Sequence, residues 1–153
     1  MTPEVLGQFR AATDRLLRAP DPAALADFMM ASDLDSGHPE IKWVRAWALR
    51  ALIPLGGPRV RPVLLAASSE SFWRLRMLAV RALALDPQAT ARLIALTRDP
   101  QWRVRDAACR SLGQGGVLTE AVVNALSTAP NDPDDRVAAS AEAAHDRLRR
   151  EMS

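Results

Sequence analysis

The sequence predicts an all-α protein built from about four stacked helix pairs behind an N-terminal capping helix. Three observations lead to this fold class: a repeated helical motif, prolines at the predicted helix starts, and a composition rich in alanine, leucine and arginine. These three residue types favour helices. Isoleucine, which favours strands, occurs only at positions 41, 53 and 94. We therefore expect no β-sheet.

A short motif recurs three times: an aliphatic residue followed by Arg, then Ala at the fourth step, Arg at the sixth and Leu at the eighth. The copies begin at Val44, Leu75 and Val104, and a degenerate fourth copy begins at Val137. These starts lie 31, 29 and 33 residues apart, a period that fits two short helices. Positions four steps apart share one helical face, which we expect to be buried. Its members are Val44, Ala48, Leu52, Leu75, Ala79, Leu83, Val104, Ala108 and Leu112.

Proline and glycine mark where the helices begin and end. Thr-Pro at 2–3 and Asp-Pro at 21–22, 86–87, 99–100 and 132–133 each predict an N-cap followed by a first-turn proline. The glycines at 56–57 and 113–116 predict helix ends. The expected helices cover about 3–18, 22–31, 39–54, 59–67, 70–85, 87–98, 100–112, 119–129 and 133–150. We expect a single domain over 1–153, with the capping helix in 1–21 and four helix pairs in 22–150.

The aspartate before the helix, the Val-Arg step, and the Ala and Leu that follow resemble HEAT repeats of the short kind, over about residues 22–150. The resemblance implies a right-handed α-solenoid. Such repeats occur in scaffolds, in lyase-like chaperones of pigment proteins and in DNA-binding proteins. The resemblance therefore specifies a fold and leaves the function open.

Charge is unevenly distributed along the chain. Residues 1–41 carry a net charge of −4, residues 42–110 a net +9, and residues 111–153 a net −3. Because sequence order is spatial order in a stack of repeats, the middle repeats should form a positive band. On a helical wheel, Arg50, Arg81 and Arg110 share one angle, and Arg74 and Arg103 lie about 20° away. We expect these five arginines to form one continuous positive strip across the middle repeats, with Arg50 at its edge. The predicted binding residues are Arg50, Trp73, Arg74, Arg81, Trp102, Arg103, Asp106 and Arg110.

These residues allow two kinds of partner. Arginines with interleaved tryptophans suit nucleic acid, because guanidinium groups bind phosphate and indole rings stack on bases. The same strip also suits an acidic protein partner. The alternative to both is that these arginines form a solvated surface that binds no partner. A structural role is expected for Arg45, Arg76 and Arg105, as partners of loop acids in neighbouring repeats, with their stems along apolar surface. We expect Trp43 and Trp47 to pack, whereas Trp73 and Trp102 either pack between repeats or stack on a ligand.

One pair of residues suggests an enzyme. Trp102 and Asp106 lie one turn apart, which is similar to the alkylpurine DNA glycosylases built from HEAT-like repeats. The resemblance implies that the carboxylate would stabilise positive charge developing on the sugar. This chain departs from that family because it is short and has no tryptophan after Asp106. The alternative is that Asp106 pairs with Arg103 and Arg110, three residues before it and four after.

Other function classes lack the motifs they need. The single cysteine, Cys109, can form neither an internal disulfide nor a Cys-based zinc site, which fits a cytoplasmic protein. Neither a secretory signal nor an apolar run long enough to span a membrane is expected. We find no nucleophile elbow, P-loop or dinucleotide motif, and expect no catalytic residue, metal or cofactor. The sequence predicts a monomeric, non-catalytic scaffold for a protein partner, with nucleic-acid binding as the alternative.

Overall fold

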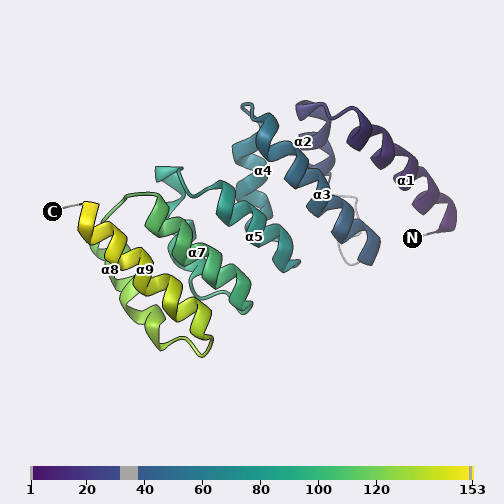
Figure 1. Ribbon diagram of the computed structural model, residues 1–153. Coiled ribbons are helices and arrows are strands. Elements are labelled where there is room, and N and C mark those ends of the chain that lie inside the picture. Colours follow the sequence, from purple (N-terminus) through teal and green to yellow (C-terminus); the bar gives the residue numbers. More distant parts are fainter. Residues whose placement is uncertain (1, 32–37, 152) are drawn as a thin grey trace. The chain divides into compact units, whose positions relative to one another are not determined.

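The computed structural model describes residues 2–31, 38–151 and 153, and within this part of the chain every regular element is a helix (Figure 1). The fold class is therefore all-α, as the sequence predicts. The chain divides into two compact units, Met1–Leu78 and Ala79–Ser153, and the boundary falls inside a helix, α5. No helix among these residues is long and apolar enough to cross a membrane.

The first unit is built around the contacts of α2 with α3 and α4. Asp21 caps α2, since its carboxylate accepts a hydrogen bond of 2.8 Å from the Ala24 amide, and Pro22 follows in the first turn. Leu25, Leu49 and Leu52 are fully buried in this core. The elements are α1 (Pro3–Arg18), α2 (Pro22–Met30), α3 (Pro39–Leu55), α4 (Val60–Ala67) and the first part of α5 (Trp73–Ala82).

The second unit packs α7 between α6 and α9, with α9 alongside α7 (Figure 1). Its core includes Leu83, Leu93, Val104, Leu126 and Leu148. Besides the end of α5, its elements are η1 (Pro87–Ala89), α6 (Thr90–Leu96), α7 (Trp102–Gln114), α8 (Glu120–Thr128), η2 (Ala129–Asn131) and α9 (Asp135–Glu151).

The motif predicts the buried positions well, with one error. Of the nine residues expected to be buried, all except Val44 are buried. Val44 is only half-buried because it lines a groove between α1 and α3. Trp43 packs in part, since its ring centre lies 5.5 Å from that of Phe72 while 42% of the residue is exposed. The expectation that Trp47 packs is wrong in large part, since its relative exposure is 56%.

Two predicted helix starts come two residues too early. Asp99 and Asp132 each accept a hydrogen bond from the amide two residues on, Gln101 and Asp134, both at 2.9 Å. This turn delays the helix, so α7 begins at Trp102 instead of residue 100, and α9 begins after Asp134. Asp99 and Asp132, unlike Asp21 before α2, therefore cap a turn that precedes the α-helix.

The helix end predicted from residue 113 onward falls two residues later. Gly113 lies inside α7, and a Cβ atom there would stand 2.7 Å from the Cβ of Ala144 and 2.9 Å from its Cα. Glycine is needed at this position because α7 and α9 approach each other so closely. Gly115 is the C-cap, and Gly116 follows with a φ of 64°.

The arginines that follow the motif's first residue are structural, as expected. Arg45 forms an ion pair of 2.6 Å with Glu70 and donates to the Met29 carbonyl at 3.0 Å. Arg105 holds the Asp132 carboxylate through two hydrogen bonds, of 2.6 and 2.8 Å. These bonds hold the pKa of Asp132 below its ordinary value and raise the pKa of Arg105. In each pair the acid lies in a loop of the next repeat.

Arg76, the third arginine of this kind, binds the loop before its own helix. Its guanidinium donates to the carbonyl oxygens of Glu70 and Ser71, both at 2.8 Å. Arg105 makes the equivalent bonds to the carbonyls of Asp99 and Pro100, at 2.9 and 3.2 Å. The motif's first arginine thus also fixes the turn that leads into its own helix.

Candidate functional site

One face of α9 carries two arginines at its ends and small residues between them. Arg136, Ser140, Ala143 and Arg147 follow one another at i, i+4, i+7 and i+11, a spacing that keeps them on one side of a helix. The adjacent face holds the buried residues Val137, Ala141, Ala144 and Leu148. Because that buried face packs against the rest of the unit, the arginine face is left at the edge of the contact with α7.

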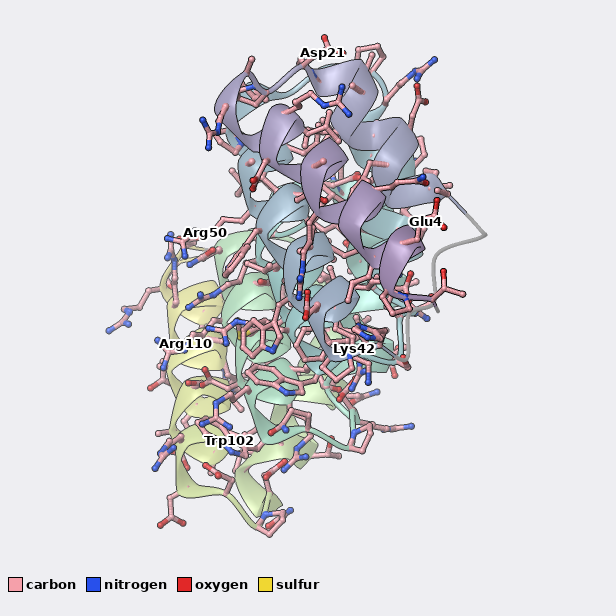
Figure 2. The ribbon with its side chains drawn as sticks, turned by 90° about the vertical axis from the view of Figure 1, so that its right-hand side faces the viewer. Glu4, Asp21, Lys42, Arg50, Trp102 and Arg110 are labelled. Carbon is pink, nitrogen blue, oxygen red and sulfur yellow. The ribbon has the colours of Figure 1, made fainter. Side chains whose placement is uncertain are left out.

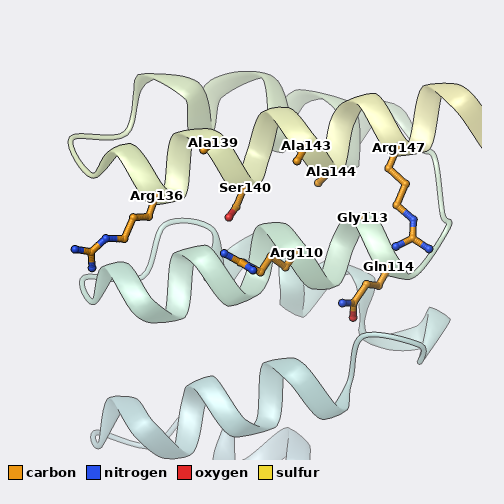
Figure 3. Close-up of a pocket in the computed structure, with 9 residues that line it drawn as sticks. All are labelled: Arg110, Gly113, Gln114, Arg136, Ala139, Ser140, Ala143, Ala144 and Arg147. Atoms are coloured by element: carbon orange, nitrogen blue, oxygen red, sulfur yellow. The ribbon is translucent and has the colours of Figure 1, made fainter.

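A groove of about 540 Å³ opens there, between α7 and α9 (Figure 3). Small residues such as Gly113 and Ala143 contribute little bulk to its wall, and guanidinium groups stand at its two ends and between them. We call this hollow the α7–α9 groove. It is lined by Arg110, Gly113, Gln114, Arg136, Ala139, Ser140, Ala143, Ala144 and Arg147.

Each of its three guanidinium groups is held by a neighbour. Arg110 donates to Asp106 at 3.1 Å and keeps 60% of its side chain exposed. Arg147 donates to Glu151 at 3.0 Å, also at the surface. The Arg136 guanidinium carbon lies 4.5 Å from the centre of the Trp102 ring. The three charges are therefore positioned in advance and still accessible to a ligand.

Trp102 lies near the start of α7, and Arg110 lies further along the same helix (Figure 2). The Trp102 ring has two arginine neighbours, since the guanidinium carbons of Arg103 and Arg136 are both 4.5 Å from its centre. Arg136 belongs to the next repeat. The ring is half-buried, so it serves packing between repeats, which was one of the two alternatives for this residue.

Asp106 forms a link between α7 and α9. Its carboxylate accepts hydrogen bonds from the Arg110 Nε at 3.1 Å and from the Ser140 hydroxyl at 2.5 Å, and its side chain is only 17% exposed. The predicted pairing with Arg110 is confirmed. Next to it, burial raises the pKa of the Cys109 thiol to about 12, and the charge of Asp106 adds to this effect.

The remaining predicted residues are distributed over both units. Arg74 belongs to the first, where its guanidinium carbon lies 4.8 Å from the centre of the Trp43 ring and 5.5 Å from that of Trp73. Arg50, also in the first unit, is exposed, and so is Arg81 in the second. The continuous arginine strip expected from the sequence stays a prediction, because its members belong to separate units.

The binding residues predicted from the sequence do not include Arg136, Ser140 or Arg147. The net charge of −3 over 111–153 predicts no positive surface in the last repeat. The signal was nevertheless present, since the same spacing rule that revealed the motif places these side chains on one face of α9. Within the described part of the chain, no cluster of His, Cys, Asp or Glu could hold a metal ion.

Comparison with known families agrees with this architecture of helix pairs. A family model described as HEAT repeats matches residues 62–145, which is more than half of the chain. The chain therefore belongs to the HEAT repeat family, whose members are generally non-catalytic and commonly act as protein-interaction scaffolds. A search of curated proteins finds no match.

Proposed function

We propose that this chain is a non-catalytic binding protein whose α7–α9 groove takes an acidic segment of a partner protein. The observation that carries the proposal is the placement of three exposed guanidinium groups, from Arg110, Arg136 and Arg147, along one groove with small residues between them. Arginine suits this role because its planar group binds carboxylates through two parallel hydrogen bonds. The small residues leave room for a peptide backbone.

The spacing of the arginines suggests the form of that segment. Arg136 and Arg147 are 11 residues apart on α9, about 16 Å along the helix axis at 1.5 Å per residue. Arg110 lies between them along the groove (Figure 3). An extended peptide advances about 3.3 Å per residue. A segment of about six residues, acidic at both ends and near its middle, would therefore meet all three arginines.

Nucleic acid is the second candidate, and the position of Trp102 favours it. An indole beside Arg103 and Arg136, at one end of a groove that contains further arginines, resembles a stacking platform next to phosphate contacts. The existing contacts of the ring weaken this candidate. The two guanidinium groups lie against the indole, so a base would have to displace at least one of them.

A glycosylase-like activity receives little support from the contacts of Asp106. Its carboxylate is bound by Ser140 and Arg110, and it would have to exchange these partners to face a sugar. We therefore propose that no catalysis occurs. Multiple-turnover release of an alkylated purine, lost in a folded Asp106→Ala variant, would show that the protein is an enzyme after all.

A salt-series titration tests the proposal. Fluorescence anisotropy would compare a labelled glutamate-rich peptide with duplex and single-stranded DNA. The variant Arg136→Gln/Arg147→Gln removes two groove charges. Arg149→Gln/Arg150→Gln is the control, because it removes the same charge from α9 residues that do not line the groove.

We expect peptide binding to weaken about tenfold in the groove variant and to change little in the control, since two exposed charged contacts of about 0.7 kcal/mol each add up to about 1.4 kcal/mol. Equal losses in both variants would mean that only net charge matters and would contradict the proposal. Tighter binding of DNA, with a salt slope that flattens by about 1 per lost phosphate contact, would favour the second candidate.

We also propose that the protein is cytoplasmic, monomeric and a single domain.

A further inference from the structure

The first unit covers an apolar face of α3 only in part, by Phe72 and Arg74 against Trp43. Trp43, Val44 and Trp47 lie on one side of this helix and line a groove of about 430 Å³ between α3 and α1. Trp47 is the more exposed of the two tryptophans, at 56%. We call this hollow the α1–α3 groove. A cavity of this volume with mostly apolar walls has the character of a ligand site.

A buried hydroxyl group at this groove has no partner. Thr13 of α1 lines the groove and is only 5% exposed, yet its Oγ1 makes no hydrogen bond within the described part of the chain. A buried polar atom without a partner destabilises a protein, and such atoms are rare in native structures. This oxygen has almost no accessible surface, so an occupant can bond to it, and relieve this cost, only after the Thr13 side chain rotates toward the groove.

The charges at the edge of the groove indicate the charge of the occupant. Arg10 and Glu40 neutralise each other through an ion pair with a hydrogen bond of 2.8 Å. Asp14 also lines the groove and is exposed, and among the described residues it makes no ion pair. The groove edge therefore offers one exposed carboxylate that has no ion-pair partner among the described residues, within a segment, 1–41, whose net charge is −4. Indole rings also attract cations, as the Arg74 guanidinium over Trp43 demonstrates.

We propose that the α1–α3 groove binds an apolar and basic segment of a partner protein. A bulky apolar side chain of that segment packs against Trp43, Val44 and Trp47. The Thr13 side chain rotates so that its hydroxyl forms a hydrogen bond with a polar group beside it, and a neighbouring lysine or arginine pairs with Asp14. This site is separate from the α7–α9 groove and takes a partner of opposite charge, so neither proposal depends on the other.

Three labelled peptides of equal length test the proposal by fluorescence anisotropy with the full chain. An amphipathic leucine–lysine peptide carries both expected features. A leucine–glutamine peptide keeps the apolar residues without the charge, and a lysine–glutamine peptide keeps the charge without the apolar residues. None of them is acidic, so none is a ligand for the α7–α9 groove.

We expect the leucine–lysine peptide to bind about fivefold more tightly than the leucine–glutamine peptide, and the lysine–glutamine peptide not to saturate. Trp47→Ala should weaken binding about tenfold or more, as loss of a central aromatic contact does. Asp14→Asn should remove the preference for lysine over glutamine. Leu85→Ala is the control, because Leu85 is another exposed apolar residue, 79% exposed, in the second unit.

Thr13→Val gives an independent measurement on the free protein. Valine has nearly the same shape and lacks the unpartnered hydroxyl, so the variant should melt at a higher temperature and bind the leucine–lysine peptide about fivefold more weakly. Equal affinity for the lysine and glutamine peptides, the same result for Trp47→Ala and Leu85→Ala, or no binding at all would overturn the proposal. A dimer of the free chain that Trp47→Ala abolishes would also overturn it, since a second copy would then occupy the groove.

Discussion

Arg105 connects two repeats of the second unit, so Arg105→Ala should destabilise the protein strongly. Its guanidinium group makes two hydrogen bonds to the Asp132 carboxylate and one each to the carbonyl oxygens of Asp99 and Pro100. The side chains of this ion pair are only 14% and 9% exposed. Water therefore screens the interaction little, unlike that of a surface pair.

The expected cost follows from what the truncation leaves behind. Removing one partner of a buried ion pair costs about 3–5 kcal/mol, because the other charge stays buried without compensation. Asp132 keeps one hydrogen bond, of 2.9 Å, from the Asp134 amide. This bond satisfies part of the carboxylate, so we expect the lower end of the range, about 3 kcal/mol. That is a large share of the roughly 5–15 kcal/mol that stabilises a typical domain.

Urea unfolding followed by circular dichroism measures this cost, and Arg110→Ala is the matched control. Arg110 lies in the same helix, but its side chain is 60% exposed and its bond to Asp106 is 3.1 Å long. An exposed pair of this kind contributes about 0.5 kcal/mol. A cost below about 1 kcal/mol for Arg105→Ala, or equal costs for the two variants, would refute the distinction between structural and groove arginines.

Three further predictions concern the second unit. Arg105 lowers the pKa of Asp132, so the ion pair stabilises the protein fully above the unfolded carboxyl pKa of about 3.9. This stability is lost as the pH falls through the lowered pKa. In urea titrations, the difference in unfolding free energy between wild type and Asp132→Asn should therefore shrink below about pH 4. Gly113→Ala should lower the unfolding free energy by about 1–2 kcal/mol, because the clash with Ala144 outweighs the better helix propensity of alanine; a more stable variant would contradict the close approach of the helices. The Cys109 thiol, whose pKa burial raises to about 12, should react with iodoacetamide only in denaturant, and fast native-state reaction at neutral pH would show that it is accessible.

Helix positions and most of the core could be predicted from the sequence because they depend on local periodicity. Each copy of the motif carries its own buried face, and the loop acids that bind Arg45 and Arg105 recur with the repeat. Val44 and Trp47 occupy the same helix as correctly predicted core residues. Whether their side is covered depends on how α1 packs on α3, which the periodicity of α3 alone does not encode.

Only part of the α7–α9 groove could be predicted from the sequence, for a similar reason. Arg110 and Trp102 stood out because they belong to a clear copy of the motif. Arg136 and Arg147 belong to the degenerate copy, in an acidic segment, and join the site only because α9 packs beside α7. A helical wheel describes one helix at a time, so it cannot show a groove formed by two.

The most direct test of the proposed binding function is to map where an acidic peptide binds, using amide chemical shifts of the labelled full chain. We expect the largest changes on the groove-lining segments of α7 and α9, at residues 110–114 and 136–147, with α3 unaffected. These changes should saturate with peptide and disappear in Arg136→Gln/Arg147→Gln. Changes centred on another surface, or scattered over all arginines without saturation, would contradict the assignment of the α7–α9 groove as the binding site.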